Sequence, residues 1–294
     1  MNYQSLKNHL KYVNPTTLQN KIRRFRNLPI KNLTKREIAA EIGEVLSFDT
    51  PFGRQAVLVP MSSHYPQGTR FYRVRNLAES DTAMPPRDMR FIEDAWNPPT
   101  HVVKQGRVNL AKESLLYTSP LNPLVAIAEM KVEENSNFSL IVYEAVSQIN
   151  VTVVGSSFET SELTEDELFK LSLLNDFLTH EFTRDVGMGT EYLYKISETI
   201  AKDYFDLPPH VHDAWQYPSV AERPSANVCF RPQVAKEKLR LVGIQIASYV
   251  RQPTGMTLQV KYTISGIGQD RVLLCHKIGS PQQLIDFPEL KLPS

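Results

Sequence analysis

The sequence predicts an α+β protein, because apolar residues recur with a helical period in some segments and alternate with polar residues in others. Leu18, Ile22 and Phe25 have helical spacing near the N-terminus. Apolar and polar residues alternate strictly over 256–264, as in a strand with one buried face. The chain has 294 residues, 41% hydrophobic and 22% charged, which allows one large domain or two modest ones and argues against disorder.

Two short amphipathic helices are expected at the N-terminus. The first ends at Pro29, and Thr34 and Glu37 form a capping box at the start of the second. From residue 1 to Arg36 there are nine Lys or Arg and no Asp or Glu, although the whole chain has a net charge of only +1. Two interpretations of this basic arm stay open. It docks nucleic acid or an acidic partner, or it packs on the body of the protein with its charges in water.

The middle of the chain mixes strands, helices and loops. Residues 48–68 contain Pro and Gly and are expected to be a connection, and a proline-containing loop is expected to cross the surface at 79–106. Four strands and a short helix are predicted around this loop. The strands lie at 71–74, 115–118, 138–146 and 151–154, and the helix at 123–130.

The second half begins with helices and ends with strands. A helix capped by Thr164 and Glu167, and another over 193–204, are expected to cover a sheet. An antiparallel meander is predicted from the alternation and turn signals of the last third. Its strands are 241–250, 256–264 and 272–278, with turns at 253–255 and 266–268. This meander either extends the central sheet or forms an accessory domain.

Several common site signatures are missing from the sequence. It has no Walker A loop, no Gly-x-Gly-x-x-Gly after a strand, no His-Glu-x-x-His and no Gly-x-Ser-x-Gly, which argues against kinases, simple Rossmann dehydrogenases, zincins and α/β-hydrolases. His210 and His212 lack further ligands, so no metal is expected. Cys229 and Cys275 are typical of reduced thiols in a cytoplasmic protein. We expect no signal peptide, because the N-terminus has no apolar core, and no membrane span, because Glu144, Gln148 and Asn150 interrupt the apolar stretch 140–154.

One ordered set of short motifs is more specific than the features described so far. It comprises Arg73, Gly106-Arg107-Val108-Asn109, Leu116-Tyr117, Ala126-Ile127-Ala128-Glu129, Tyr217-Pro218-Ser219 and Asn227. In this order the motifs resemble the RES domain, which is named for its Arg, Glu and Ser. The resemblance covers roughly residues 71–232. It implies an ADP-ribosyltransferase-like core around a split sheet, which binds NAD+ and breaks its nicotinamide–ribose bond.

The resemblance also implies roles for individual residues. Arg107, Tyr117, Glu129 and Ser219 match the family's arginine, tyrosine, glutamate and serine and are the candidate catalytic residues. The chemistry suits them: a guanidinium can hold the NAD+ pyrophosphate, and a tyrosine can stack on nicotinamide or ribose. A carboxylate such as that of Glu129 can stabilise the positive charge that develops on the ribose. Ser219 can hydrogen-bond a phosphate, the ribose or the carboxylate.

The remaining cofactor-binding candidates are Arg73 and Asn227, beside Arg107, Tyr117 and Ser219. Arg73 fits the arginine of the domain's first strand. The neighbouring Arg75 could equally face the site, and the sequence does not separate the two.

The expected function is cleavage of NAD+ with transfer of ADP-ribose to inorganic phosphate or water, in a toxin or defence effector with an antitoxin or other protein partner. Two alternatives stay open: an ADP-ribosyltransferase with a macromolecular target, and a non-catalytic NAD+-sensing module. Nucleic acid would bind only through the basic arm. The expected domains are a basic helical extension at 1–60, a RES-like NAD-binding domain at 61–232 and a β-rich extension at 233–294.

Overall fold

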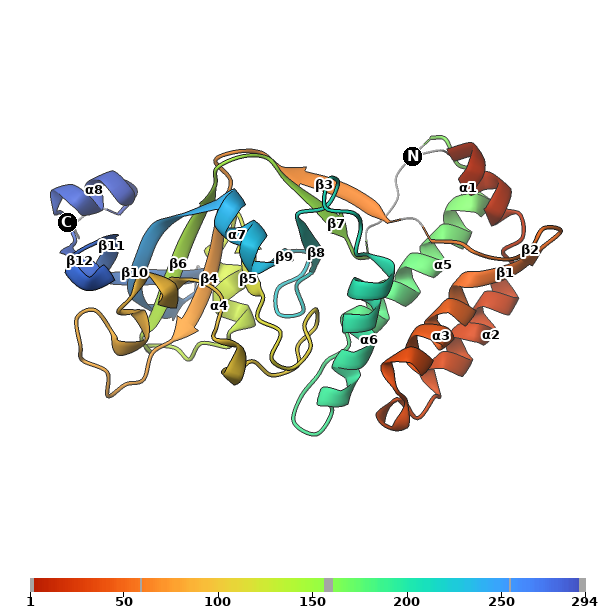
Figure 1. Ribbon diagram of the computed structural model, residues 1–294, viewed down its shortest axis with the longest axis horizontal. Helices are drawn as coiled ribbons and strands as arrows, with labels where there is room; N and C mark the ends of the chain where they lie inside the picture. Colours follow the sequence, from red (N-terminus) through yellow and green to blue (C-terminus); the bar gives the residue numbers. More distant parts are fainter. Residues whose placement is uncertain (1–2, 59, 156–160, 254, 291–294) are drawn as a thin grey trace. The chain divides into compact units, whose positions relative to one another are not determined.

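The computed structural model describes residues 3–58, 60–155, 161–253 and 255–290 and has the predicted α+β composition (Figure 1). Two compact units make up the chain. Unit 1 contains Met1–Ser63, Lys104–Glu113 and Thr152–Pro218, and unit 2 contains His64–Val103, Ser114–Val151 and Ser219–Ser294. The chain passes from one unit to the other five times: within strands β3 (Met61–Tyr65) and β7 (Ile149–Val153), and after residues 103, 113 and 218. Each unit is therefore built from separate stretches of sequence, whereas the predicted domains are consecutive.

Unit 1 is mainly helical. Its helices are α1 (Tyr3–Leu10), α2 (Pro15–Arg26), α3 (Lys35–Leu46), α5 (Glu165–Phe182) and α6 (Tyr194–Thr199), and its strand β8 spans Ala214–Pro218. The predicted capping boxes of Thr34 and Thr164 both form. Helix α2 packs beside α3 and against α5 (Figure 1), where the rings of Phe25 and Phe177 meet edge to face at 5.2 Å.

The predicted connection at 48–68 is wrong in part. Strands β1 (Ser47–Thr50) and β2 (Gly53–Ala56) form a hairpin there, and β3 follows. The turn uses Gly53 at φ 97°, a backbone conformation that glycine adopts without a steric penalty. The hydroxyl of Thr50 closes the turn by donating to the Gly53 carbonyl at 2.7 Å. The Pro and Gly signals therefore mark a hairpin turn as well as a connection.

Unit 2 contains a large antiparallel sheet. In chain order its strands are β4 (Arg70–Asn76), β5 (Leu116–Pro120), β6 (Phe138–Ala145), β9 (Ala226–Phe230), β10 (Leu239–Gln252), β11 (Gly255–Ile267) and β12 (Leu273–Lys277). Their spatial order is β12-β11-β10-β6-β4-β5-β9, and every neighbouring pair is antiparallel. The predicted meander is confirmed as β10, β11 and β12. It extends the sheet, because β10 pairs with β6. Thr254, in the predicted turn 253–255, lies outside the described residues.

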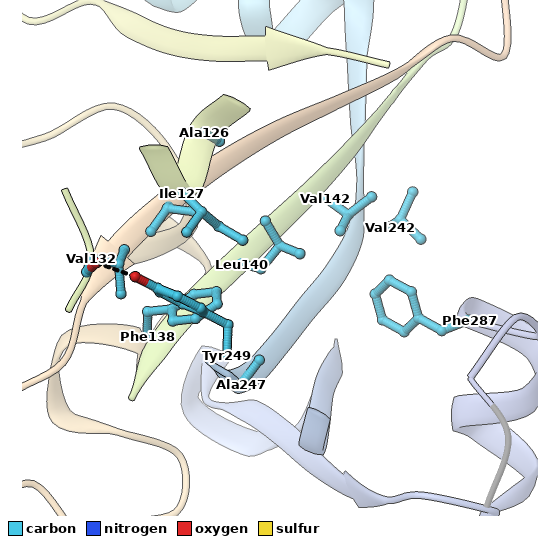
Figure 2. Close-up of a cluster of buried hydrophobic side chains, with 11 residues drawn as sticks. Ala126, Ile127, Val132, Phe138, Leu140, Val142, Val242, Ala247, Tyr249 and Phe287 are labelled. Atoms are coloured by element: carbon cyan, nitrogen blue, oxygen red, sulfur yellow. Dashed lines mark hydrogen bonds between the residues drawn. The ribbon is translucent and has the colours of Figure 1, made fainter. Parts of the chain in front are cut away.

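The core of unit 2 lies between this sheet and helix α4 (Pro123–Glu129), which packs on β4 and β5. Ala126 and Ile127 from α4 join Phe138, Leu140 and Tyr249 in one buried cluster (Figure 2). The buried Tyr249 hydroxyl donates to the Val132 carbonyl at 2.9 Å, so its polar end is satisfied. This packing fixes the position of α4, which ends at Glu129.

The remaining elements are short. They are the 3₁₀ helices Ile30–Asn32, Arg87–Met89, Ile92–Ala95, Thr100–Val102, Glu191–Leu193 and Gln269–Arg271, the π-helical turn Ile200–Tyr204, and helices α7 (Pro232–Lys238) and α8 (Pro281–Asp286). The predicted loop at 79–106 is irregular apart from three of these 3₁₀ turns. None of the helices within the described residues has the length and apolar character that a membrane crossing needs.

Candidate functional site

The half-buried carboxylate of Glu129 is held through one of its two oxygens. Its Oε1 accepts hydrogen bonds from Ser219 Oγ at 2.5 Å, Asn227 Nδ2 at 2.7 Å and the backbone N of Val220 at 3.1 Å, with the N of Ala221 at 3.5 Å. None of the hydrogen bonds within the described residues reaches Oε2. The carboxylate is thus fixed in orientation, with one oxygen available to a ligand.

Ser219 ties the following loop to this carboxylate. Its side chain is fully buried, and its hydroxyl also accepts from the backbone N of Glu222 at 3.0 Å. The backbone N of Ser219 donates to the Ser225 carbonyl at 2.8 Å and closes the loop over residues 219–225. The structure therefore brings together Glu129 and Ser219, as the sequence predicts.

Asn227 reaches the same carboxylate from strand β9. Its side-chain oxygen Oδ1 accepts from the hydroxyl of Ser119 at 2.7 Å, while its Nδ2 donates to Glu129. Asn227 was expected to bind the cofactor, and in this structure its amide contacts protein groups. Sequence reasoning missed Ser119 altogether. Its position two residues after Tyr117, on the same strand face, is the signal that could have found it.

Tyr117 lies on the same face of the sheet as this cluster. Strands β5 and β9 pair Tyr117 with Cys229 and Thr118 with Val228. Side chains alternate between faces along a strand, so Tyr117 and Ser119 project to one side, where Ser119 meets Asn227. The tyrosine is half-buried. The structure thus gathers Tyr117, Asn227 and Glu129 on one face of unit 2.

Arg73 and Arg75 lie on the opposite face of the sheet. Tyr72 pairs with Ser119, so Arg73 and Arg75, one and three residues further along β4, project away from the face that carries Ser119. Arg73 donates to the Trp96 carbonyl, and Arg75 donates to the Asp88 carbonyl at 2.9 Å. Burial, and then the charge of Arg73, lower the pKa of Arg75. Neither arginine is brought to Glu129, because residues two apart on a strand share a face.

Arg107 belongs to unit 1 and is held there by the end of a helix. It donates to the carbonyl of Phe182, the last residue of α5, at 2.8 Å, and to the carbonyl of Arg184 at 3.0 Å. Its guanidinium carbon also lies 5.7 Å from the ring centre of Tyr194. These contacts anchor the segment 104–113 on unit 1. The expected role of Arg107 as a clamp for the NAD+ pyrophosphate stays a prediction.

The basic N-terminal arm is paired with acidic groups of unit 1. Arg24 forms an ion pair with Glu41. Arg26 pairs with the buried Glu181 at 3.0 Å, and Lys35 with the buried Glu198 at 2.9 Å. The arm's helices pack on α5 and α6, so part of the charge counted in the sequence is neutralised within the unit. This arrangement favours the hypothesis that the arm packs on the body of the protein over the hypothesis that it docks nucleic acid or an acidic partner.

The two histidines considered as metal ligands, His210 and His212, lie in unit 1. His212 is buried, with its Nδ1 2.7 Å from the hydroxyl of Thr152 and its Nε2 3.6 Å from the carboxylate of Asp206. His210 is exposed in the turn before it. Within the described residues no three His, Cys, Asp or Glu side chains lie where they could hold a metal ion together.

Glu129, Ser219 and Asn227 together present a fixed carboxylate, one oxygen of which takes no hydrogen bond from the part of the chain that the structure describes. Such a group can stabilise positive charge that develops on a bound substrate, or accept a hydrogen bond from it. The half-buried ring of Tyr117 on the same face can stack on a planar group. Comparisons of the chain with protein-family models, with curated proteins and with solved structures find no match.

Proposed function

We propose that this protein consumes NAD+: it breaks the nicotinamide–ribose bond and transfers ADP-ribose to inorganic phosphate or water. The observation that carries the proposal is the Glu129 carboxylate, whose Oε1 takes hydrogen bonds from Ser219 and Asn227 while its Oε2 takes none from the described residues. A carboxylate fixed in this way is already oriented when charge develops in the transition state, so no reorganisation is needed then.

The proposed reaction develops the charge that such a carboxylate stabilises. The bond between the ribose C1′ and the nicotinamide nitrogen breaks, and its electron pair leaves with nicotinamide, which becomes neutral. C1′ gains oxocarbenium character and is attacked by an oxygen of phosphate or water, which then loses a proton to solvent. In the proposal Glu129 lies beside C1′ and Tyr117 stacks on nicotinamide or ribose.

The ADP-ribosyltransferase-like core is part of the same proposal. It rests on the order of the RES-like motifs along the chain, and the antiparallel sheet of unit 2 with α4 packed on one face is compatible with it. A role as a toxin or defence effector, restrained by a separate antitoxin, follows from the same resemblance.

The decisive test incubates the purified full chain with NAD+, with and without inorganic phosphate, and follows nicotinamide release while mass spectrometry identifies the ADP-ribose product. The variant Glu129→Gln removes the charge but keeps a carbonyl oxygen at Oε1, so all four protein donors retain an acceptor. We expect this variant to fold and to turn over at least roughly two orders of magnitude more slowly. Glu133→Gln, at an exposed glutamate of the same unit, is the matched control and should match the wild type.

The outcomes separate the possible acceptors. Release that requires phosphate identifies an NAD+ phosphorylase, and free ADP-ribose without phosphate identifies a hydrolase. Labelled ADP-ribose on protein or nucleic acid would identify a macromolecular acceptor instead. Saturable NAD+ binding without release, unchanged by Glu129→Gln, would contradict the proposal and favour a sensor.

A further inference from the structure

We infer that Ser119 is a positioning residue: through the Asn227 amide, it holds the Glu129 carboxylate in the orientation that the proposed reaction uses. The inference rests on the proposed function for its catalytic part only. Ser119 Oγ lies 2.7 Å from Asn227 Oδ1, and Asn227 Nδ2 lies 2.7 Å from Glu129 Oε1. The three side chains thus form a chain of hydrogen bonds that ends on the carboxylate.

The hydroxyl of Ser119 determines which way the Asn227 amide faces. An amide has an oxygen that only accepts and a nitrogen that only donates, and the two ends are similar in shape. If the amide turned over, its oxygen would meet the carboxylate oxygen of Glu129, and two acceptors would be left without a proton between them. A donated hydrogen bond from Ser119 to Oδ1 favours the observed orientation, in which Nδ2 donates to Glu129.

The position of Ser119 is fixed by the sheet. The pairing of β5 with β9 places it opposite Asn227, and only 2% of its surface is exposed. The hydrogen bond between Ser119 and Asn227 is therefore shielded from water that could replace it. Ser119 bonds Asn227 and makes no hydrogen bond to Glu129, so its effect on the carboxylate is indirect.

The neighbouring residue on β5 provides a matched control. Thr118 is 3% exposed, and its hydroxyl donates to the Val228 carbonyl at 2.9 Å. It projects to the other face of the strand, away from Asn227. Thr118→Val therefore removes an equally buried hydroxyl from the same strand without touching the relay.

The catalytic test compares Ser119→Ala, Ser119→Thr and Thr118→Val in the nicotinamide-release assay. We expect Ser119→Ala to lower kcat roughly tenfold with KM changed less than about twofold, because the residue supports the carboxylate and does not touch substrate. Ser119→Thr keeps the donating hydroxyl and should recover most of the rate. Thr118→Val should retain the wild-type rate. A Ser119→Ala variant with wild-type kcat, or one that falls no further than Thr118→Val, would overturn the inference.

A stability measurement tests the relay without any activity. Urea unfolding of Ser119→Ala, Asn227→Ala and the double variant should show less than additive losses, because each single change strands the partner's polar group and the double change strands neither. Thr118→Val combined with Asn227→Ala should be additive. Additive losses for Ser119 and Asn227 would overturn the relay.

The two measurements also distinguish the inference from the proposed function. Coupled stability in a protein that releases no nicotinamide would retain the relay and reject the NAD+ reaction. Should Ser119→Ala not fold, Ser119→Cys gives the same comparison, since a thiol of similar size is only a weak donor.

Discussion

Ser219 donates its hydroxyl proton to Glu129 Oε1 at 2.5 Å, across 90 residues of sequence. The serine follows Pro218 at the start of a loop, and the glutamate is the last residue of α4. The same hydroxyl accepts from the backbone N of Glu222, so one small side chain fixes both the carboxylate and the loop beside it. A change at Ser219 should therefore affect both stability and the proposed reaction.

Ser219→Ala should lower the free energy of unfolding by about 1–2 kcal/mol, because the backbone N–H of Glu222 and the carboxylate of Glu129 each lose a partner. Nicotinamide release should fall by roughly one to two orders of magnitude, since the carboxylate is less firmly oriented. Urea unfolding and the release assay measure the two effects. Ser225→Ala, in the same loop, is the control, because Ser225 bonds Ser219 and Glu222 through its backbone groups. Equal behaviour of the two variants would contradict the role given to the Ser219 hydroxyl.

Arg107→Lys should destabilise the protein by about 1–2 kcal/mol. The guanidinium donates to two carbonyls at the end of α5 at once, and an ammonium on a flexible stem does not reproduce this planar arrangement. Thermal unfolding measures the loss, with the exposed Arg23→Lys as the control that should leave the melting temperature unchanged. An Arg107→Lys protein as stable as the wild type would show that the anchoring contacts contribute little.

Lys35→Met should lose stability progressively as the pH rises from 5 to 8. Burial raises the pKa of Glu198, and the hydrogen bond and charge of Lys35 oppose this effect. Burial lowers the pKa of Lys35, but its hydrogen bond to Glu198 and the nearby carboxylates outweigh this and raise it. For the buried Glu198 the effect of burial dominates, and its pKa lies above the ordinary value.

The sign of the pH effect follows from Glu198. A carboxyl whose folded pKa lies above its unfolded value stabilises the fold at low pH, and that stability is lost as the pH rises through the folded pKa. Without Lys35 the pKa of Glu198 rises further, so the variant should be about 1–2 kcal/mol less stable than the wild type at pH 8, with a smaller loss at pH 5; the partial exposure of Lys35 keeps the figure small. Urea unfolding at pH 5 and at pH 8 measures this difference in stability, with Lys31→Met, at an exposed lysine, as the control. A loss independent of pH would contradict the role of Glu198.

Local patterns predicted most elements of the fold. The capping boxes at Thr34 and Thr164, the short helix that ends at Glu129, and the meander of β10, β11 and β12 all depend on residues close in sequence. The hairpin of β1 and β2 was missed, because its strands are four residues each and carry no clear alternation. Helix α1 was also missed, because its eight residues lie in the N-terminal segment that was interpreted from its positive charge alone.

The candidate site was predicted in its residue types and only partly in its arrangement. The motif order indicated Glu129, Ser219 and Tyr117. In the structure Ser219 bonds Glu129 directly, and Tyr117 lies on the same face of unit 2. It also indicated Arg73, yet the face on which a strand residue projects depends on the register of its neighbours, and the pairing of Tyr72 with Ser119 sends Arg73 to the other side.

The sequence by itself determined which residue types are present for the proposed chemistry, and where the helices capped by Thr34 and Thr164 begin. Only the tertiary structure decided that Ser219 and Asn227 both bind Oε1 of Glu129, and that Ser119 stands behind Asn227. The reason is physical: caps and periodicity arise from neighbours within a few residues, whereas these hydrogen bonds join segments about a hundred residues apart. Their geometry exists only once β5, β9 and α4 have packed together.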